Sequence, residues 1–392
     1  MGRGLRTDAT ISVIHSTKLW LPQTMTWLYT QVVNLPPRVT NCVVCEEALN
    51  LDQFEIPNCF VTRGGNLFSR ALHKQSWRYA EWSRARCLGA CVSSFGSNIL
   101  HSHFGDYGYA DISNARRHGL QHVVTFYGYD ASRLPHRDPT WKDRFAEMFD
   151  TVSLCLCEGP HMADTISELG CPDEKIIVHH LGINVAAIRF SPRSWKPGET
   201  LRFLIAGSFT EKKGFPYAIE ALGRLKGRYD LELTVIGDDN GTSRMISEKQ
   251  SINRAIDRAG LRKCTRMLGK MPYTALLDQA YEHHIFLQPS IVASDGDTEG
   301  GAPVTIIDML ATGMPVVATT HCDIPEVVPE SHQKMLAVER NVDDLEAKIE
   351  WLIENPRILP QLIADGRHHV EQEFNARIQG ERLARIYEGL VS

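Results

Sequence analysis

Short runs of apolar, often β-branched residues alternate with longer amphipathic segments along the whole chain. The runs have the length of buried strands, and the segments between them have the spacing of helices that bury one face. Repeated alternation of this kind predicts an α/β protein built on parallel sheets. The predicted strands are residues 11–15, 41–45, 98–103, 123–126, 152–157 and 176–181 in the first half and 203–206, 233–236, 285–287 and 316–319 in the second.

The alternation breaks once, after Phe190. The next eight residues carry two prolines and a glycine and show no periodicity, which is typical of a linker. We therefore predict two doubly wound, Rossmann-like domains followed by a helix long enough to cross back to the first domain. The predicted divisions are 1–190 for the first domain, 191–200 for the linker, 201–370 for the second domain and 371–392 for the final helix.

Composition narrows the function classes. A length of 392 residues suits two domains, and 43% hydrophobic residues with a net charge of −5 argue against a nucleic-acid binder. No apolar run is long enough to span a membrane, and the run at 11–14 is too short for a signal peptide. Ten cysteines spread over both halves fit reduced, buried thiols, which predicts a cytoplasmic protein without a metal site.

The most informative segment, residues 294–308, lies between a predicted strand and a predicted helix. Gly300 and Gly301 permit close approach of a ligand to the backbone, and Pro303 suits a first helical position, so the free amides of this helix end should bind a phosphate. Glu299 could accept hydrogen bonds from sugar hydroxyls, and Asp308 could reach a ribose. The alternative is a helix-capping loop whose acids are favoured by the helix dipole.

A second segment, residues 206–215, follows the first strand of the second half and carries Lys212 and Lys213. Cations at the start of a helix are disfavoured by its dipole, which supports a functional role. A solvated pair of lysines is the alternative.

The first half offers weaker signals. Residues 125–130 follow a strand, and Tyr127 there is a poor base at neutral pH, so we expect Tyr127 to position a ligand. Asp130 is expected to orient the loop or to contact an acceptor, unless it forms a simple turn. His101 and His103 point the same way on a strand, but no third metal ligand is evident, so acceptor contact or packing is expected. Basic residues between 63 and 86, with Trp77 among them, suit an anionic lipid surface or a polyanionic acceptor, and a solvated charged face is the alternative.

Segment 294–308, together with residues 311–319 and 324–326, resembles the carboxylate motif of the retaining glycosyltransferases of family 4, which have the GT-B fold. Residues 206–215 resemble that family's Gly-Arg-Leu loop ending in Lys-Gly, and residues 267–272 its loop that meets the nucleotide base. In the first half, residues 125–130 resemble its His-Gly-x-Asp site. Residues 24–31 are similar to the opening helix of members of the exopolysaccharide and colanic acid type. The resemblance implies two Rossmann-like domains that face each other across a cleft.

The resemblance also implies roles for individual residues. Those expected to act on the reacting groups are Glu299, Lys213, Tyr127 and Asp130. Those expected to bind the donor are Ser208, Lys212, Lys213, Lys270, Met271, Gly300, Gly301, Ala302, Pro303 and Asp308. Those expected on the acceptor side are Thr24, Thr26 and His103, although Thr24 and Thr26 could simply cap a helix.

The sequence departs from the family pattern at several of these positions. Ser208 stands where arginine is usual, Tyr127 where histidine is usual, and Asp308 where a second glutamate is usual. Met25 replaces a glutamate. One cation of the usual pair is therefore missing unless Lys212 or another cation compensates.

The resemblance implies a retaining, metal-independent hexosyltransferase without a cofactor. It would move a sugar from a nucleotide diphosphate sugar to a glycan, lipid-linked or polysaccharide acceptor, in the cytoplasm or peripherally at the inner face of an anionic membrane. Two alternatives stay open, a non-catalytic subunit that binds nucleotide sugar and a nucleotide-sugar epimerase. A dehydrogenase is disfavoured because no strand is followed by Gly-x-Gly-x-x-Gly.

Overall fold

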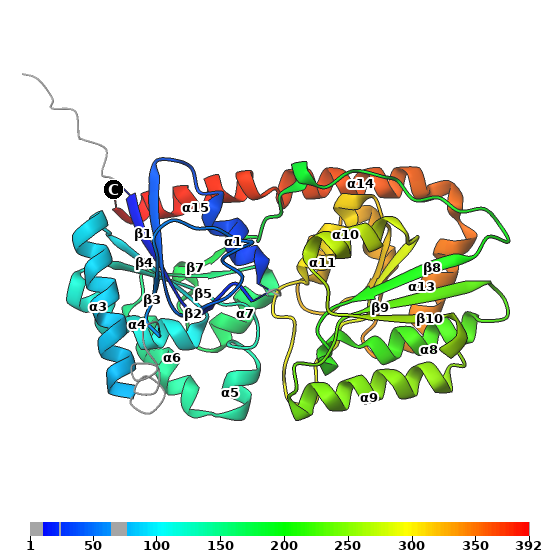
Figure 1. The fold of residues 1–392 in the computed structure, drawn as a ribbon, viewed down its shortest axis with the longest axis horizontal. Helices are drawn as coiled ribbons and strands as arrows, with labels where there is room; N and C mark the ends of the chain where they lie inside the picture. The colour runs from blue at the N-terminus through cyan, green and yellow to red at the C-terminus, as the bar shows by residue number, and fades with distance from the viewer. Residues whose placement is uncertain (1–10, 23–24, 64–76, 392) are drawn as a thin grey trace, which may run out of the picture. The chain divides into compact units, whose positions relative to one another are not determined.

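A computed structural model describes residues 11–22, 25–63 and 77–391 of the chain (Figure 1). The chain forms two compact units. The first comprises residues 1–158, 163–182 and 376–392, and the second comprises residues 159–162 and 183–375. The sequence-based boundary at residue 190 differs from this division, which falls at 182/183.

The first unit is built on a seven-stranded parallel sheet of order β3-β2-β1-β4-β5-β6-β7. Alternate residues of its strands face opposite sides, so Ile14 packs with helices α3 and α4 while Val13 packs with helix α15. Its elements are β1 (Ile11–Trp20), α1 (Thr26–Val33), β2 (Val39–Ala48), β3 (Cys59–Val61), α3 (Trp77–Phe95), β4 (Ile99–His103), α4 (Gly105–His118), β5 (Gln121–Thr125), α5 (Arg133–Arg137), α6 (Thr140–Thr151), β6 (Leu154–Cys157), α7 (Pro160–Glu168, begun in the second unit), η1 (Asp173–Lys175), β7 (Ile176–Val178) and α15 (Ala376–Val391).

The second unit is built on a six-stranded parallel sheet of order β10-β9-β8-β11-β12-β13. Helices α8, α9 and α13 pack on one face and α10 and α11 on the other, while α14 contributes residues to both core clusters. Its elements are η2 (Val185–Ala187), β8 (Leu201–Ala206), η3 (Glu211–Lys213), α8 (Phe215–Leu225), β9 (Leu231–Ile236), α9 (Ser243–Arg258), η4 (Arg262–Cys264), β10 (Thr265–Gly269), α10 (Tyr273–Tyr281), β11 (Ile285–Gln288), α11 (Val304–Thr312), β12 (Val316–Thr319), α12 (Ile324–Val327), η5 (Glu330–Met335), β13 (Leu336–Ala337), α13 (Val342–Glu354), η6 (Pro356–Ile358) and α14 (Leu359–Glu373).

All ten predicted strands are present, and the α/β class with parallel sheets is confirmed. The strands that the sequence did not indicate, β3, β10 and β13, are short or lie at a sheet edge, where the apolar pattern is weakest. Among the described helices, none combines the length and apolarity needed to cross a bilayer.

The predicted linker is packed structure in the second unit. The guanidinium of Arg193 donates hydrogen bonds to the carbonyls of Ala280, His283 and Thr312, and Trp195 is buried in the core. The prolines interrupt the hydrophobic periodicity of this segment, so the sequence predicted a linker although the segment buries two large side chains.

The last helix, α15, belongs to the first unit and lies beside β1 (Figure 1). Leu383 and Tyr387 are buried against the sheet. Arg38, which precedes β2, forms ion pairs of 2.5 Å with Glu381 and 2.6 Å with Glu388. The end of the chain therefore returns to the unit that contains its beginning.

Candidate functional site

In the second unit, the strand order reverses between β8 and β11, and ligands of such sheets bind at the carboxyl ends of the strands beside this point. Two loops meet there. Gly214, after η3, adopts a left-handed conformation with φ of +62°, and a Cβ at this position would lie 1.8 Å from the carbonyl oxygen of Pro289. The amide of Ile291 also donates to the carbonyl of Lys212 at 2.8 Å. These contacts fix η3 against the loop that follows β11.

Lys213 and Glu299 form an ion pair where the two loops meet. The Lys213 ammonium lies 2.9 Å from Glu299 Oε1, and Oε1 also accepts a hydrogen bond of 2.8 Å from the Ser290 hydroxyl. Burial of the Glu299 side chain works to raise its pKa, but the charges of Lys213 and Lys212 outweigh burial and hold the pKa below its usual value. Glu299 is therefore a carboxylate at neutral pH.

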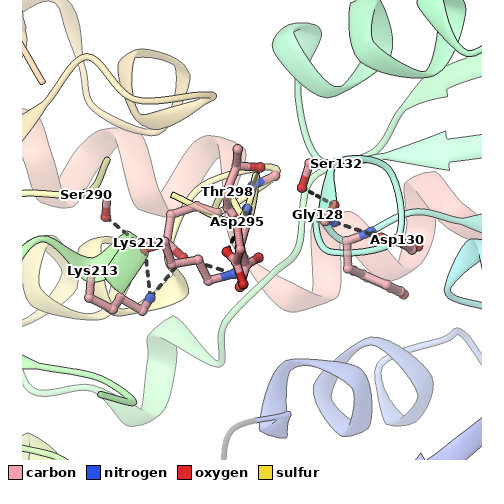
Figure 2. Close-up of polar contacts among 12 residues, drawn as sticks. Gly128, Asp130, Ser132, Lys212, Lys213, Ser290, Asp295 and Thr298 are labelled. Atoms are coloured by element: carbon pink, nitrogen blue, oxygen red, sulfur yellow. Dashed lines mark hydrogen bonds and ion pairs between the residues drawn. The ribbon is translucent and has the colours of Figure 1, made fainter. Parts of the chain in front are cut away.

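Lys212 is engaged by the same loop. Its ammonium donates a hydrogen bond of 2.7 Å to the Thr298 carbonyl (Figure 2). It also donates to Asp297 Oδ1 at 3.2 Å and lies 3.9 Å from Glu299. Arg244 from α9 completes the cluster with an ion pair of 2.6 Å to Asp297. Burial works to raise the pKa of Asp297, but Lys212 and Arg244 together hold it below its usual value. Arg244 is thus a third cation at the site.

Two hydrogen bonds in series, which the sequence did not indicate, hold the backbone of Glu299. Its amide donates to His321 Nε2 at 3.1 Å, and His321 Nδ1 lies 2.7 Å from Glu339 Oε1. Because Nε2 accepts a hydrogen bond, the ring proton sits on Nδ1 and donates to Glu339. His321, Glu339 and Arg244 stand 22 to 55 positions from Glu299, so no local motif could have identified them.

The glycine-rich turn after Glu299 leads into α11. Gly300 has φ of +78°. Pro303 is the N-cap residue of α11, whereas the sequence predicted it as the first helical residue. The amides at the start of an α-helix lack partners within the helix and favour an anion. Gly301, Ala302 and Pro303 thus lead to an end of α11 that suits a phosphate, next to Glu299.

Asp308 lies inside α11 and is buried, with its Oδ1 accepting a hydrogen bond of 2.7 Å from the Tyr273 hydroxyl. Burial raises the pKa of Asp308 to about 7, against the opposing effect of the Tyr273 hydrogen bond. Tyr273 occupies only Oδ1 of the Asp308 carboxyl group, and the ribose contact of Asp308 stays a prediction.

The raised pKa of Asp308 leads to a prediction about stability. The folded state disfavours the charged form, so its contribution is neutral below about pH 4, becomes unfavourable as the pH rises and reaches its full cost above about pH 7. Asp308→Asn keeps an acceptor for Tyr273 and removes the charge. We expect its melting temperature to exceed that of the wild type at pH 8 and to match it near pH 4. The control is Asp278→Asn, which changes an exposed residue on α10. A difference in melting temperature between Asp308→Asn and the wild type that does not vary with pH would count against the raised pKa of Asp308.

The remaining predicted donor residues lie around the same sheet edge. Ser208 is in the loop after β8, and its carbonyl accepts a hydrogen bond from the Thr210 amide. Lys270 follows β10 and donates to the Asp239 carbonyl at 2.7 Å. Met271 packs partly buried against the core cluster that contains α11. These residues supply a hydroxyl, a cation and an apolar side chain.

In the first unit, Asp130 orients its loop. Its carboxylate accepts hydrogen bonds from the amides of Gly105, Tyr127 and Gly128 at 2.7 to 3.1 Å, and Figure 2 shows it turned toward Gly128. Burial raises the pKa of Asp130 to about 6. Burial also raises the pKa of the Tyr127 hydroxyl well above its usual value, which fits a hydrogen-bond donor and not a base.

The three residues predicted on the acceptor side lie in different surroundings. Thr24 lies outside the described residues. Thr26 begins α1, and the neighbouring Trp27 packs on Tyr127 with ring centroids 4.4 Å apart. His103 is fully buried, and its ring nitrogens lie 2.7 Å from the Tyr127 hydroxyl and 3.1 Å from His15 Nδ1, so its contact with an acceptor stays a prediction. His15 is the third histidine of a cluster with His101 and His103. The sequence did not indicate it, because it lies on a different strand.

Comparisons with known proteins agree with one another. A model of the family described as "Glycosyl transferases group 1" matches residues 188–369. The amylovoran biosynthesis glycosyltransferase AmsK of Erwinia amylovora is 32% identical over 323 residues, covering 80% of this chain and 76% of AmsK. The protein WcaL of Salmonella typhimurium, assigned to colanic acid biosynthesis, is 31% identical over 327 residues, covering 79% and 76%.

Solved structures show the same fold. Anabaena HepE in complex with UDP and glucose superposes with a TM-score of 0.76 and 13% identity, covering 97% of this chain and all of HepE. A glycosyltransferase from Rickettsia africae superposes with a TM-score of 0.75 and 15% identity, covering 98% and 99%. The predicted GT-B fold is confirmed.

Proposed function

We propose, from the premise that this chain belongs to the glycosyl transferases of group 1, that it transfers a sugar from a nucleotide diphosphate sugar with retention of configuration. The acceptor we propose is a glycan, lipid-linked or polysaccharide hydroxyl, because the relatives AmsK and WcaL are named for polysaccharide biosynthesis. HepE, which shares the fold, binds UDP and glucose.

The observation that carries the proposal is the ion pair between Lys213 and Glu299 beside the start of α11. Both side chains are largely buried, with 13% and 5% of their areas exposed. Desolvation of two charges costs free energy, and desolvated charge pairs of this kind cluster at functional sites. A diphosphate at that helix end would receive amide hydrogen bonds and the positive charge of Lys213.

In the proposed reaction, the bond between the anomeric carbon and the diphosphate oxygen breaks as the acceptor oxygen bonds to the same face of that carbon. The acceptor proton passes to an oxygen of the leaving phosphate, so no protein base is needed. Lys213 stabilises the charge that grows on the leaving diphosphate, and Glu299 accepts hydrogen bonds from sugar hydroxyls. The remaining task of the protein is alignment, which loops fixed by Gly214 and His321 support.

Further roles follow from the same proposal. Lys270 and Met271 would contact the base, and Asp308 would contact the ribose. Tyr127 would donate a hydrogen bond near the reacting sugar, positioned by the loop that Asp130 holds. The proposed reaction uses no metal and no cofactor at this site. Contact with an anionic membrane and a cytoplasmic location stay predictions, and Arg70 and Lys74 of the basic segment lie outside the described residues.

The test begins with melting temperatures measured in the presence of UDP, GDP and ADP. Sugars on the preferred base are then incubated with an acceptor extract, and release of the diphosphate and the anomeric configuration of the product are recorded. We expect release that depends on the acceptor and a product with the donor's configuration. A melting shift without release would indicate a binding subunit, and conversion of the donor sugar without acceptor would indicate an epimerase.

A further inference from the structure

Three buried histidines lie together on one face of the first sheet, below α15. His15 on β1 pairs in register with His101 on the adjacent strand β4, and His103 is two residues further along β4. Residues two apart on a strand point to the same face, so the parallel pairing brings the three imidazoles together. All three have no exposed surface.

The spacing of the three rings suits a metal ion. Each histidine offers one ring nitrogen that lies within 4.8 Å of those of the other two. Nitrogen ligands of a tetrahedral zinc ion stand about 3.4 Å apart, given Zn–N bonds of about 2.1 Å. Closing the longest separation therefore requires at most about 1.4 Å of movement, which rotation of imidazole rings can supply.

The protonation state also suits a metal. Burial lowers the pKa of His15 to about 3 and lowers those of His101 and His103 well below the usual value. The rings are therefore neutral at physiological pH, and neutral imidazole is the form that binds metal. Buried ligands of this kind need no proton to leave before a metal binds.

The surroundings resemble the outer partners of metal-bound histidines. His103 Nδ1 lies 2.7 Å from the Tyr127 hydroxyl, and Nε2 would exchange its 3.1 Å contact with His15 Nδ1 for the ion. The two nitrogens of His101 lie 2.6 Å from the hydroxyls of Tyr387 and Thr125, and one of these contacts would be given up on binding. A histidine that binds metal usually holds its second nitrogen on a partner of this sort.

Hydrogen bonding among the three rings leaves one polar atom unexplained. His15 Nδ1 and His103 Nε2 are 3.1 Å apart and can share a single proton. His15 Nε2 has no partner among the described residues, although it is buried. A buried donor or acceptor without a hydrogen-bond partner destabilises the folded state. A metal ion bound through His15 Nε2 would give this nitrogen the partner that it lacks.

We propose that His15, His101 and His103 form a binding site for a divalent transition-metal ion, with zinc as the expected ion. Imidazole ligands suit zinc, and the absence of exposure is typical of a structural site. The fourth position of the ion would be filled by a nearby hydroxyl or a water. The site would tie β1 to β4 and, through His103, to Tyr127, and it is separate from the site formed by Lys213 and Glu299.

The test measures metal content directly. The full chain is produced in zinc-supplemented medium, passed through a desalting column and analysed by mass spectrometry for metals. We expect about one zinc per chain in the wild type and a loss of at least about fivefold in His15→Gln and His101→Gln. The control is His332→Gln, which changes a fully buried histidine of the second unit and should keep the metal.

Cobalt substitution covers the case in which the variants fail to fold. The wild type, refolded with Co²⁺ alone, should show the visible d–d absorption of a tetrahedral ion. Wild-type protein with less than about a tenth of an equivalent of zinc and no cobalt absorption would overturn the proposal. Equal zinc in folded His15→Gln and wild type would overturn it as well. Neither readout depends on sugar transfer, so the outcome is independent of the proposed function.

Discussion

Replacing Lys213 with glutamine is expected to lower the turnover of the glycosyltransferase by about 100-fold. Lys213 lies 2.9 Å from Glu299 and is the cation nearest to that carboxylate. On leaving, a diphosphate gains negative charge that a fixed ammonium stabilises more strongly than it stabilises the bound donor. Glu299→Gln, which removes the other member of the pair and keeps its size, is expected to lower turnover by more than about tenfold. Diphosphate release at saturating donor measures both.

The matched control is Lys334→Gln, which removes an exposed lysine of the same unit. It should leave turnover within about twofold of the wild type, as expected for a surface charge away from the site. Circular dichroism and melting temperature confirm that each variant is folded. Normal turnover in folded Lys213→Gln and Glu299→Gln would remove both residues from the site.

Gly214→Ala is expected to have the largest effect on stability. The left-handed conformation at φ of +62° costs about 1–2 kcal/mol for a residue with a side chain. The new Cβ would lie 1.8 Å from the Pro289 carbonyl oxygen, so the backbone must move, which costs about 1–3 kcal/mol more. The melting temperature should fall by about 5–15 °C. Turnover should fall too, because the movement separates Lys213 from Glu299.

Gly198→Ala separates the two causes. Gly198 also has positive φ, at +83°, but no atom lies within 4 Å of the position of its Cβ. It should therefore lose only the conformational part, about 1–2 kcal/mol, with turnover unchanged. Equal losses of stability in the two variants would mean that contact with Pro289 does not fix the loop.

The fold could be predicted from the sequence because its signal is periodic and local. Most of the ten predicted strands contain a run of apolar residues that the parallel sheet buries, although β4 carries His101 and His103 and β7 lies at a sheet edge. The short edge strand β13, at residues 336–337, has too few residues to form such a run. Segment 191–200 was predicted as a linker because its prolines suppress the hydrophobic periodicity. In the structure, Arg193 and Trp195 of this segment are buried in the second unit.

The candidate site could be predicted where its residues lie in continuous loops. Lys213 and Glu299 each follow a buried strand, and the sheet order brings the ends of those strands together. The supporting residues could not be predicted, because Arg244 and Glu339 reach the site from distant elements. The same holds for His15, which meets His101 only through the register of β1 and β4. Pairing between strands is decided by the whole sheet and leaves no local pattern.

The central claim is that a diphosphate binds at the start of α11 beside Glu299 and against Lys213. The most direct test is to measure, by titration calorimetry, the dissociation constants of the preferred nucleoside diphosphate and of its nucleoside for wild type and Lys213→Gln. We expect the wild type to bind the diphosphate at least about tenfold more tightly than the nucleoside, and the variant to lose most of that preference while it binds the nucleoside normally. The same preference in both proteins, or none in the wild type, would contradict the account.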